Sequence, residues 1–306
     1  MIRPFELRDL GSFRRLAPQG LCLETRAAFI QEVRSLQSAL WGRLLPGSRT
    51  RTLLWEGPEG ATAFAQVRQD SGSPLARLVY LAPKEIIERA AASEVVEGVL
   101  SEAGRAGAHH LLAEAEEGSD LFGFLRRQCF GVYARQDLWR QDEVRESAGS
   151  FPGSLRPERP SDRSQAQSLY LAVVPALVQQ VETMPWGSGQ AYVLIQEDDL
   201  VGYFRLSFGE RGLWIEPFFH PAAREVAEVM QSLLVWLRPR PERPVYVCVR
   251  SYQDWLGPIL QHAGLHLCGE QAVLVRRIVV PIAESSQVVL SAIEKHATRA
   301  TPIRGQ

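Results

Sequence analysis

The sequence lacks long apolar runs and carries almost no net charge. No apolar stretch approaches the roughly 18 residues that a membrane-spanning helix needs, so we expect no membrane partner. Residues 1–6 lack the basic start and apolar stretch of a secretion signal, which makes the cytoplasm the expected location. The formal net charge is −1 with no block of like charges, and we therefore expect no nucleic-acid partner.

Cysteine is scarce, and its spacing excludes the common metal and disulfide patterns. The four cysteines stand far apart, without a Cys-x-x-Cys pair or a cluster with histidine: Cys22, Cys129, Cys248 and Cys268. We expect buried, reduced thiols. The neighbours His109 and His110 fall on a predicted strand, where adjacent side chains point to opposite faces. We therefore expect no metal site.

What the sequence does contain is an internal repeat. Ile-Arg-Pro at residues 2–4, followed by Asp9, recurs as Leu-Arg-Pro at 155–157, followed by Asp162 at the same spacing. The second copy begins near the middle of the 306-residue chain, and two domains of such length are of ordinary size. We predict an N-terminal domain at 1–150, a C-terminal domain at 151–281 and a tail at 282–306. The boundary falls in a stretch at 145–154 that resists regular structure.

The two halves also share an order of predicted elements. Each has a helical start, an antiparallel meander, and then helix, strand, helix and strand. In the first half the strands are predicted at 51–56, 62–68, 76–81, 110–115 and 130–140, and the helices at 84–104 and 120–128. In the second half the strands are predicted at 192–196, 201–208, 212–219, 244–249 and 271–280, and the helices at 223–237 and 255–263.

The repeated opening and this element order resemble the Gcn5-related N-acetyltransferase (GNAT) family. An Ile-Arg-Pro strand leading into an Asp-capped helix is similar to the family's start, and residues 125–130 and 260–265 resemble its late Tyr-Glu-Lys-Leu-Gly-Phe segment. The resemblance implies an α+β fold with two tandem acetyltransferase-like domains. Each domain is expected to be a mixed, mostly antiparallel sheet flanked by helices.

The family's acyl-CoA loop, Gln/Arg-x-x-Gly-x-Gly/Ala, has degenerate counterparts here. In the second half Arg224 stands at the first position, but Ala227 and Val229 replace the glycines that bring the backbone close to phosphate. Glu225 and Glu228 would oppose the phosphates. In the first half residues 89–93 contain no glycine at all, so the second half keeps the better remnant.

The resemblance implies acetyl-CoA as co-substrate, bound where two strands of the second half splay apart. Arg224 and the amides of Glu225, Val226 and Ala227 would hold the pyrophosphate. Phe218 and Phe219 would border the pantetheine channel. A side chain that filled this cleft would instead favour a protein without acyl transfer.

Glu216 lies on the strand where the family often carries its general base. Flanking Trp214 and Phe218 are expected to raise its pKa by desolvation. The alternative is a strand carboxylate that faces solvent. The family's acidic tyrosine is replaced by leucine in both halves, and Tyr252 is the nearest substitute. The loop at 186–190 stands where such folds admit the acceptor.

Two functions of different classes remain open. The first is acyl-CoA-dependent N-acyl transfer in the C-terminal half, with a small-molecule or peptide amine as acceptor and the first half as scaffold or lid. The second is a non-catalytic acetyltransferase-like module that binds a ligand or a protein, which the double loss of glycines and tyrosine favours. A relative of this fold that transfers an aminoacyl group without CoA is a third.

Overall fold

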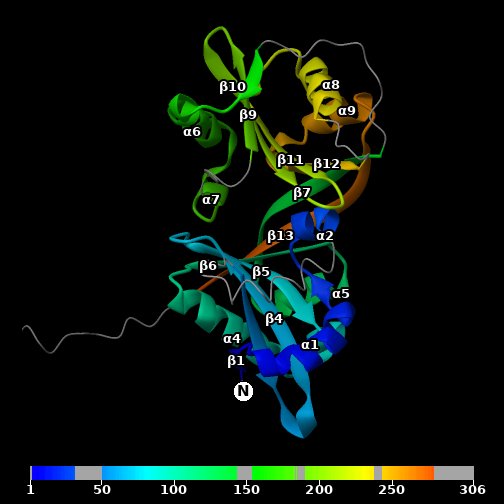
Figure 1. Ribbon diagram of the computed structural model, residues 1–306. Helices are drawn as coiled ribbons and strands as arrows, with labels where there is room; N and C mark the ends of the chain where they lie inside the picture. The colour runs from blue at the N-terminus through cyan, green and yellow to red at the C-terminus, as the bar shows by residue number, and fades with distance from the viewer. Residues whose placement is uncertain are drawn as a thin grey trace, which may run out of the picture.

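The architecture comes from a computed structural model, which describes residues 2–31, 50–142, 154–182, 184, 190–237 and 243–278. The predicted boundary stretch and the predicted tail at 282–306 lie almost wholly outside these residues. Two lobes stack along the long axis of the molecule in Figure 1, and long strands pass between them. None of the described helices combines the length and the apolar character that crossing a membrane requires.

Both halves are mixed α+β structures. The first half supplies β1 (Ile2–Pro4), α1 (Leu10–Leu16), β2 (Leu21–Cys22), α2 (Thr25–Ile30), β3 (Thr50–Glu56), β4 (Thr62–Gln69), β5 (Leu75–Ala82), α4 (Ala92–Arg105), β6 (His110–Ala115), α5 (Asp120–Arg127) and β7 (Gly131–Gln141). The second half supplies β8 (Leu155–Pro157), α6 (Arg163–Val173), α7 (Ala176–Gln179), β9 (Gln190–Gln196), β10 (Asp199–Phe208), β11 (Leu213–Phe219), α8 (Val226–Trp236), β12 (Val245–Arg250), α9 (Leu256–His262) and β13 (His266–Arg277).

The helix predicted at 84–104 is wrong at its start. Lys84–Glu88 forms a 3-10 turn, and α4 begins at Ala92, because Arg89 is extended with φ −90° and ψ 149°. Ile86 and Ile87 are nevertheless buried. Their apolar spacing reflects contact with the core rather than a continuous helix.

The repeated Arg and Asp make the same structural staple in each half. Arg3 donates two hydrogen bonds to Asp9, at 2.7 and 2.8 Å, and Arg156 donates two to Asp162, at 2.6 and 2.9 Å. Each buried carboxylate also accepts the backbone N–H three residues before it, at 2.8 and 2.7 Å. Such bidentate, charge-assisted pairs fix the turn after each first strand. The predicted duplication is confirmed.

One sheet runs through the whole molecule, and the halves exchange their last strands within it. The order is β1-β3-β4-β5-β6-β13-β7-β12-β11-β10-β9-β8. Strand β13, from the second half, pairs antiparallel with β6 of the first, and β7 pairs antiparallel with β12. The two exchanged strands also pair with each other (Figure 1). The sheet therefore has no free edge between the halves.

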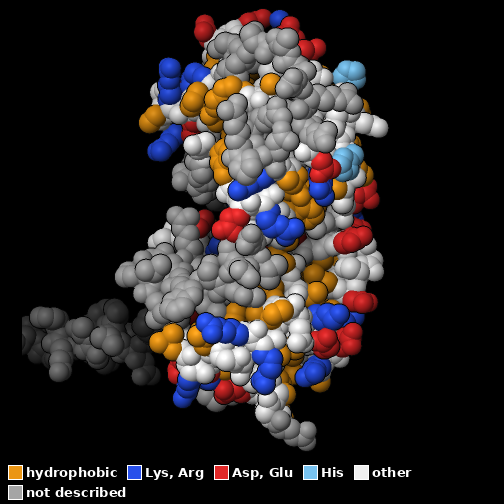
Figure 2. Space-filling model, turned by 45° about the vertical axis from the view of Figure 1, so that its right-hand side comes forward, with side chains coloured by type: hydrophobic (Ala, Val, Ile, Leu, Met, Phe, Trp, Pro, Cys, Tyr) orange, Lys and Arg blue, Asp and Glu red, His pale blue; other side chains and the backbone are white. Residues whose placement is uncertain are grey.

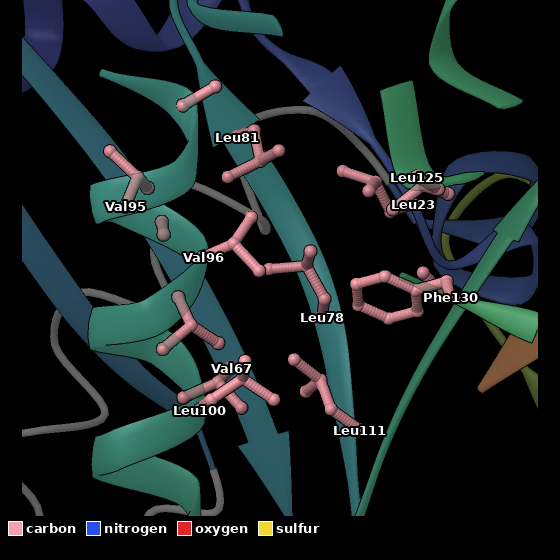
Figure 3. Close-up of a cluster of buried hydrophobic side chains, with 14 of the residues drawn as sticks. Leu23, Val67, Leu78, Leu81, Val95, Val96, Leu100, Leu111, Leu125 and Phe130 are labelled. Carbon is pink, nitrogen blue, oxygen red and sulfur yellow. The ribbon is translucent and has the colours of Figure 1, made fainter. Parts of the chain in front are cut away.

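Helices cover both faces of the sheet. In the first half Val95, Val96 and Leu100 of α4 belong to one buried cluster with Leu78 and Leu111 of the strands (Figure 3). In the second half α8 and α9 bury an equivalent apolar face, while α6 and α7 cover the opposite one. Side chains alternate between the two faces along each strand, so each strand contributes residues to the buried layers on both faces of the sheet.

Candidate functional site

A cavity of about 640 Å³ lies between the halves, and we call it the inter-half cavity. Charged side chains from both halves line it. Those from the first half are Glu24, Arg26, Arg68, Asp70, Arg77 and Glu114, and those from the second are Glu182, Arg205, Glu216 and Arg250. Figure 2 shows acidic and basic side chains side by side where the lobes meet. The volume lies within the usual range for small-molecule pockets.

Glu182 is the hub of this charged wall. Arg77 and Arg250 each donate to it at 2.9 Å, and the Tyr133 hydroxyl donates to it as well. Burial alone would raise the pKa of Glu182, but the charges of Arg250 and Arg77 outweigh burial and lower it. Arg77 comes from the first half, so this carboxylate joins the halves electrostatically.

Glu24 is a second buried carboxylate, on the wall of the first half. Arg26 lies 3.3 Å from it, and Arg68 contacts the same carboxylate oxygen. Burial acts to raise the pKa of Glu24, while the two guanidinium groups lower it and prevail. Glu114 accepts the Thr25 backbone N–H at 2.8 Å and lies 3.5 Å from Arg77.

The predicted base, Glu216, lines the inter-half cavity rather than facing open solvent. Arg205 contacts both of its oxygens, at 2.7 and 2.8 Å, and the Trp214 indole N–H donates to it at 2.9 Å. The expected rise in its pKa is wrong. Burial acts upward, but Arg205, Arg26 and the Trp214 hydrogen bond lower the pKa of Glu216 to about 2. Near neutral pH it is therefore a fixed anion.

The two phenylalanines predicted to border one channel do not share a wall. Phe218 lines the inter-half cavity. Phe219, one residue later, points to the opposite face, where its ring centroid lies 5.0 Å from that of Phe204 and 6.3 Å from that of Trp255. Adjacent strand residues alternate between faces, which explains the separation.

The predicted pyrophosphate loop lies apart from the cavity. Arg224 is exposed and pairs with the exposed Glu197 at 3.0 Å. Glu225 precedes α8 in the left-handed conformation, with φ 55°, which a residue other than glycine adopts at some cost. Val226 is buried against the core and Ala227 is partly buried. None of these four side chains lines the cavity.

Parallel strands diverge in each half, and we call the two openings the first and the second splay. The second splay opens where the pairing of β11 with β12 ends at Ile215 and Val247. The carboxamide of Gln253 lies across it. It accepts the Phe219 backbone N–H at 2.8 Å and donates to the Pro217 carbonyl at 3.0 Å. The β11 groups at Pro217 and Phe219 are thus already hydrogen-bonded by the chain itself.

The first splay opens where the pairing of β5 with β6 ends at Arg77 and Leu112. A segment of the same chain fills it. Leu23 donates its backbone N–H to Val79 at 2.8 Å, and its carbonyl accepts the Glu114 N–H at 3.0 Å. Strand β2 continues this pairing along β5, and the Leu23 side chain joins the buried cluster of Figure 3. The segment therefore acts as a strand between β5 and β6.

The remaining predicted residues are placed as follows. Tyr252 lines the inter-half cavity, and burial raises its pKa further from neutrality. Leu125 and Leu260, at the positions of the family's tyrosine, are buried in the two cores. Residues 186–189 of the predicted acceptor loop lie outside the described part of the chain. Within that part, no group of three His, Cys, Asp or Glu side chains is placed to hold a metal ion.

Comparison with known proteins bears on the fold. No protein-family model matches the chain, and no curated protein is similar to it in sequence. A GCN5-related N-acetyltransferase from Sphaerobacter thermophilus matches 92% of this chain and 96% of its own, at 13% identity and a TM-score of 0.55. A tandem GNAT protein from the clavulanic acid biosynthesis pathway matches 92% of this chain and 99% of its own, at 13% identity and a TM-score of 0.57. The chain has a tandem GNAT fold.

A putative acetyltransferase from Pyrococcus horikoshii shares this fold, at 13% identity and a TM-score of 0.54, over 90% of this chain and 89% of its own. The predicted α+β tandem architecture is confirmed. These structural neighbours carry the names of acetyltransferases, while identity this low establishes the tandem GNAT fold and not a reaction.

Within the tandem GNAT fold, sequence reasoning missed Gln253 and the Arg–Glu network. Gln253 is the last residue of the 3-10 turn Ser251–Gln253 that follows β12, and it is 1% exposed. A long polar side chain just after an apolar strand is a weak signal that it serves the neighbouring backbone. The network had no sequence signal, because its charges come from residues as distant as Arg77 and Glu182.

Proposed function

We propose that the protein is a non-catalytic tandem GNAT-fold module that binds a small ligand in the inter-half cavity. The observation that carries this proposal is the state of the two splays. The first is filled by the backbone of Leu23, and the second is bridged by the buried carboxamide of Gln253. An acyl-CoA chain would have to displace the protein's own hydrogen bonds at either place.

The charges of the cavity also support binding over proton transfer. A general base works best when its pKa lies near the working pH. Here the pKa values of Glu24, Glu182 and Glu216 are lowered, while burial raises the pKa of Tyr170 and Tyr252. These groups hold their charge state across neutral pH, which suits recognition of a charged ligand.

A blocked cavity tests the proposal. Ser71 is exposed on the turn between β4 and β5 and lines the cavity, so Ser71→Trp places a bulky ring in it without overpacking the core. Glu210→Trp makes a matched change on an exposed turn outside the cavity. In ligand-detected NMR with a small-fragment set, we expect fragments that bind the wild type and Glu210→Trp but not Ser71→Trp. Equal binding to all three proteins, or to none, would refute the proposal.

A second candidate is acyl-CoA-dependent N-acyl transfer in the C-terminal half, with acetyl-CoA as co-substrate and an amine as acceptor. One observation favours it: Glu216, Phe218 and Tyr252 line the cavity beside the end of the β11–β12 pairing. A thioester in the second splay would therefore face the cavity. Arg224 and the amides of Glu225 to Ala227 would then hold the pyrophosphate.

Thiol release from acetyl-CoA with a panel of amines tests this candidate. Acyl transfer that falls by roughly a hundredfold in Glu216→Gln, with CoA binding retained, would establish it. Glu117→Gln, in an exposed ion pair with Arg135 in the first half, is the matched control and is expected to change nothing. If the wild type releases no thiol, the binding module stands.

A further inference from the structure

The charged wall of the inter-half cavity is unbalanced. Among the described residues with partly or fully buried side chains that line it, five are arginines and four are glutamates. Asp70 also lines the cavity, but it stands on an exposed turn and already takes part in another interaction. Counted over these described side chains, the buried part of the wall has one positive charge more than it has negative charges.

The ion pairs locate that excess. Arg205 is matched by Glu216, which it contacts at 2.7 Å. Arg77 and Arg250 are matched by Glu114 and Glu182 taken together. These two groups are electrically neutral.

Arg26 and Arg68, in contrast, share the single carboxylate of Glu24. Burial lowers the pKa of Arg68, and the like charges of Arg26 and Arg77 add to this effect against the attraction of Glu24. The surplus positive charge thus sits on the wall of the first half.

The two guanidinium groups are placed to receive an anion. Arg26 and Arg68 both line the cavity, and their side chains are 24% and 20% exposed. Arg26 also reaches the second half, where it donates to the Ser207 hydroxyl at 3.5 Å. Guanidinium groups bind carboxylates through paired, charge-assisted hydrogen bonds. Apolar side chains, Val178, Met184 and Phe218, line another part of the cavity, beside polar ones such as Gln136 and Tyr252.

We infer that the ligand is a small organic monocarboxylate, bound through its carboxylate by Arg26 and Arg68 and through its apolar body by Val178, Met184 and Phe218. This inference rests on the proposed binding function. One carboxylate neutralises the surplus charge, whereas a phosphate monoester with close to two charges would exceed it. The ligand would join the halves, since Arg26 and Phe218 belong to different ones.

Matched probes test the chemistry. Phenylacetate, phenylacetamide and phenethylamine share one ring and differ in charge, and inorganic phosphate carries the anion without the ring. In calorimetric or NMR titration we expect phenylacetate to bind about tenfold more tightly than the neutral phenylacetamide or the cationic phenethylamine. Tighter or equal binding of the amide or the amine would overturn the inference, and so would displacement of phenylacetate by equimolar phosphate.

Substitution of the arginine locates the subsite. Arg26→Met should weaken phenylacetate binding about tenfold, and Arg26→Lys, which keeps the charge but loses the planar fork, should weaken it less. Arg26→Met is expected to fold because Arg68 still neutralises Glu24. Arg105→Met, on the exposed surface outside the cavity, is the control and should bind as the wild type does. Unchanged binding in Arg26→Met would overturn the inference.

The outcomes separate this inference from the proposed function. If Ser71→Trp blocks the binding of fragments that show no preference for a carboxylate, that result would support the binding module and refute the monocarboxylate ligand. Failure of every probe and fragment to bind the wild type would remove both.

Discussion

Replacing the hub carboxylate, Glu182→Gln, is the sharpest test of the joint between the halves. The change keeps the size of the side chain and removes its charge. It leaves the guanidinium groups of Arg77 and Arg250 without the anion that each contacts at 2.9 Å. The Tyr170 hydroxyl, which donates to the Glu182 backbone carbonyl at 2.6 Å, is unaffected.

The expected loss follows from burial. Removing one partner of a fully buried ion pair costs about 3–5 kcal/mol. The Glu182 side chain is 15% exposed, and Arg77 keeps Glu114 at 3.5 Å, so we expect a loss of about 2–3 kcal/mol in the free energy of unfolding. This is a large share of the stability of an ordinary domain.

Urea unfolding at neutral pH measures the effect as a lower midpoint with an unchanged slope. The control is Glu197→Gln, in an ion pair whose side chains are 77% and 74% exposed, and it should cost no more than about 0.5 kcal/mol. Equal small losses in the two variants would refute the idea that Glu182 joins the halves.

Three further predictions concern the fold. Glu24, Glu182 and Glu216 have lowered pKa values in the folded protein, so their ionised forms stabilise the fold above about pH 4.3, the pKa of a glutamate in the unfolded chain. This stabilisation is lost as the pH falls through the pKa values of the folded protein, which reach about 2 for Glu216. The urea midpoint should therefore drop below about pH 4.5, and a flat profile would contradict this. Gly209→Ala would place a Cβ 2.1 Å from the Ile30 carbonyl oxygen of the other half, and it should lower the free energy of unfolding by about 1–3 kcal/mol. In the control Gly11→Ala the added Cβ meets nothing within 4 Å, so this change should be neutral or stabilising. Residues 1–142 alone lack β13, which lies between β6 and β7, so circular dichroism should show no cooperative unfolding; a cooperative transition would show that the exchanged strand is dispensable.

Local signals predicted much of the fold. The Arg3 and Asp9 pair recurs as Arg156 and Asp162, and both pairs form the staple that such spacing allows. Most strands were predicted because their apolar residues alternate or run together over short stretches. The start of α4 was predicted wrongly, because a buried residue such as Ile86 has the same apolar spacing in a 3-10 turn as in an α-helix.

Long-range contacts were beyond such reasoning. Apolar periodicity identifies β13 as a strand but does not say that it lies beside β6 of the other half. Leu23 fills the first splay through backbone hydrogen bonds, which no side-chain pattern encodes. Glu216 was correctly placed on a strand, but its pKa depends on Arg205, the residue opposite it on the neighbouring strand.

We propose that the splays are closed to acyl-CoA and that the inter-half cavity is the binding site. Calorimetric titration of acetyl-CoA into the full chain tests it most directly. We expect no saturable heat at millimolar acetyl-CoA, because Gln253 and Leu23 already form hydrogen bonds with the backbone groups of the splays. Saturable binding of one acetyl-CoA per chain would contradict it.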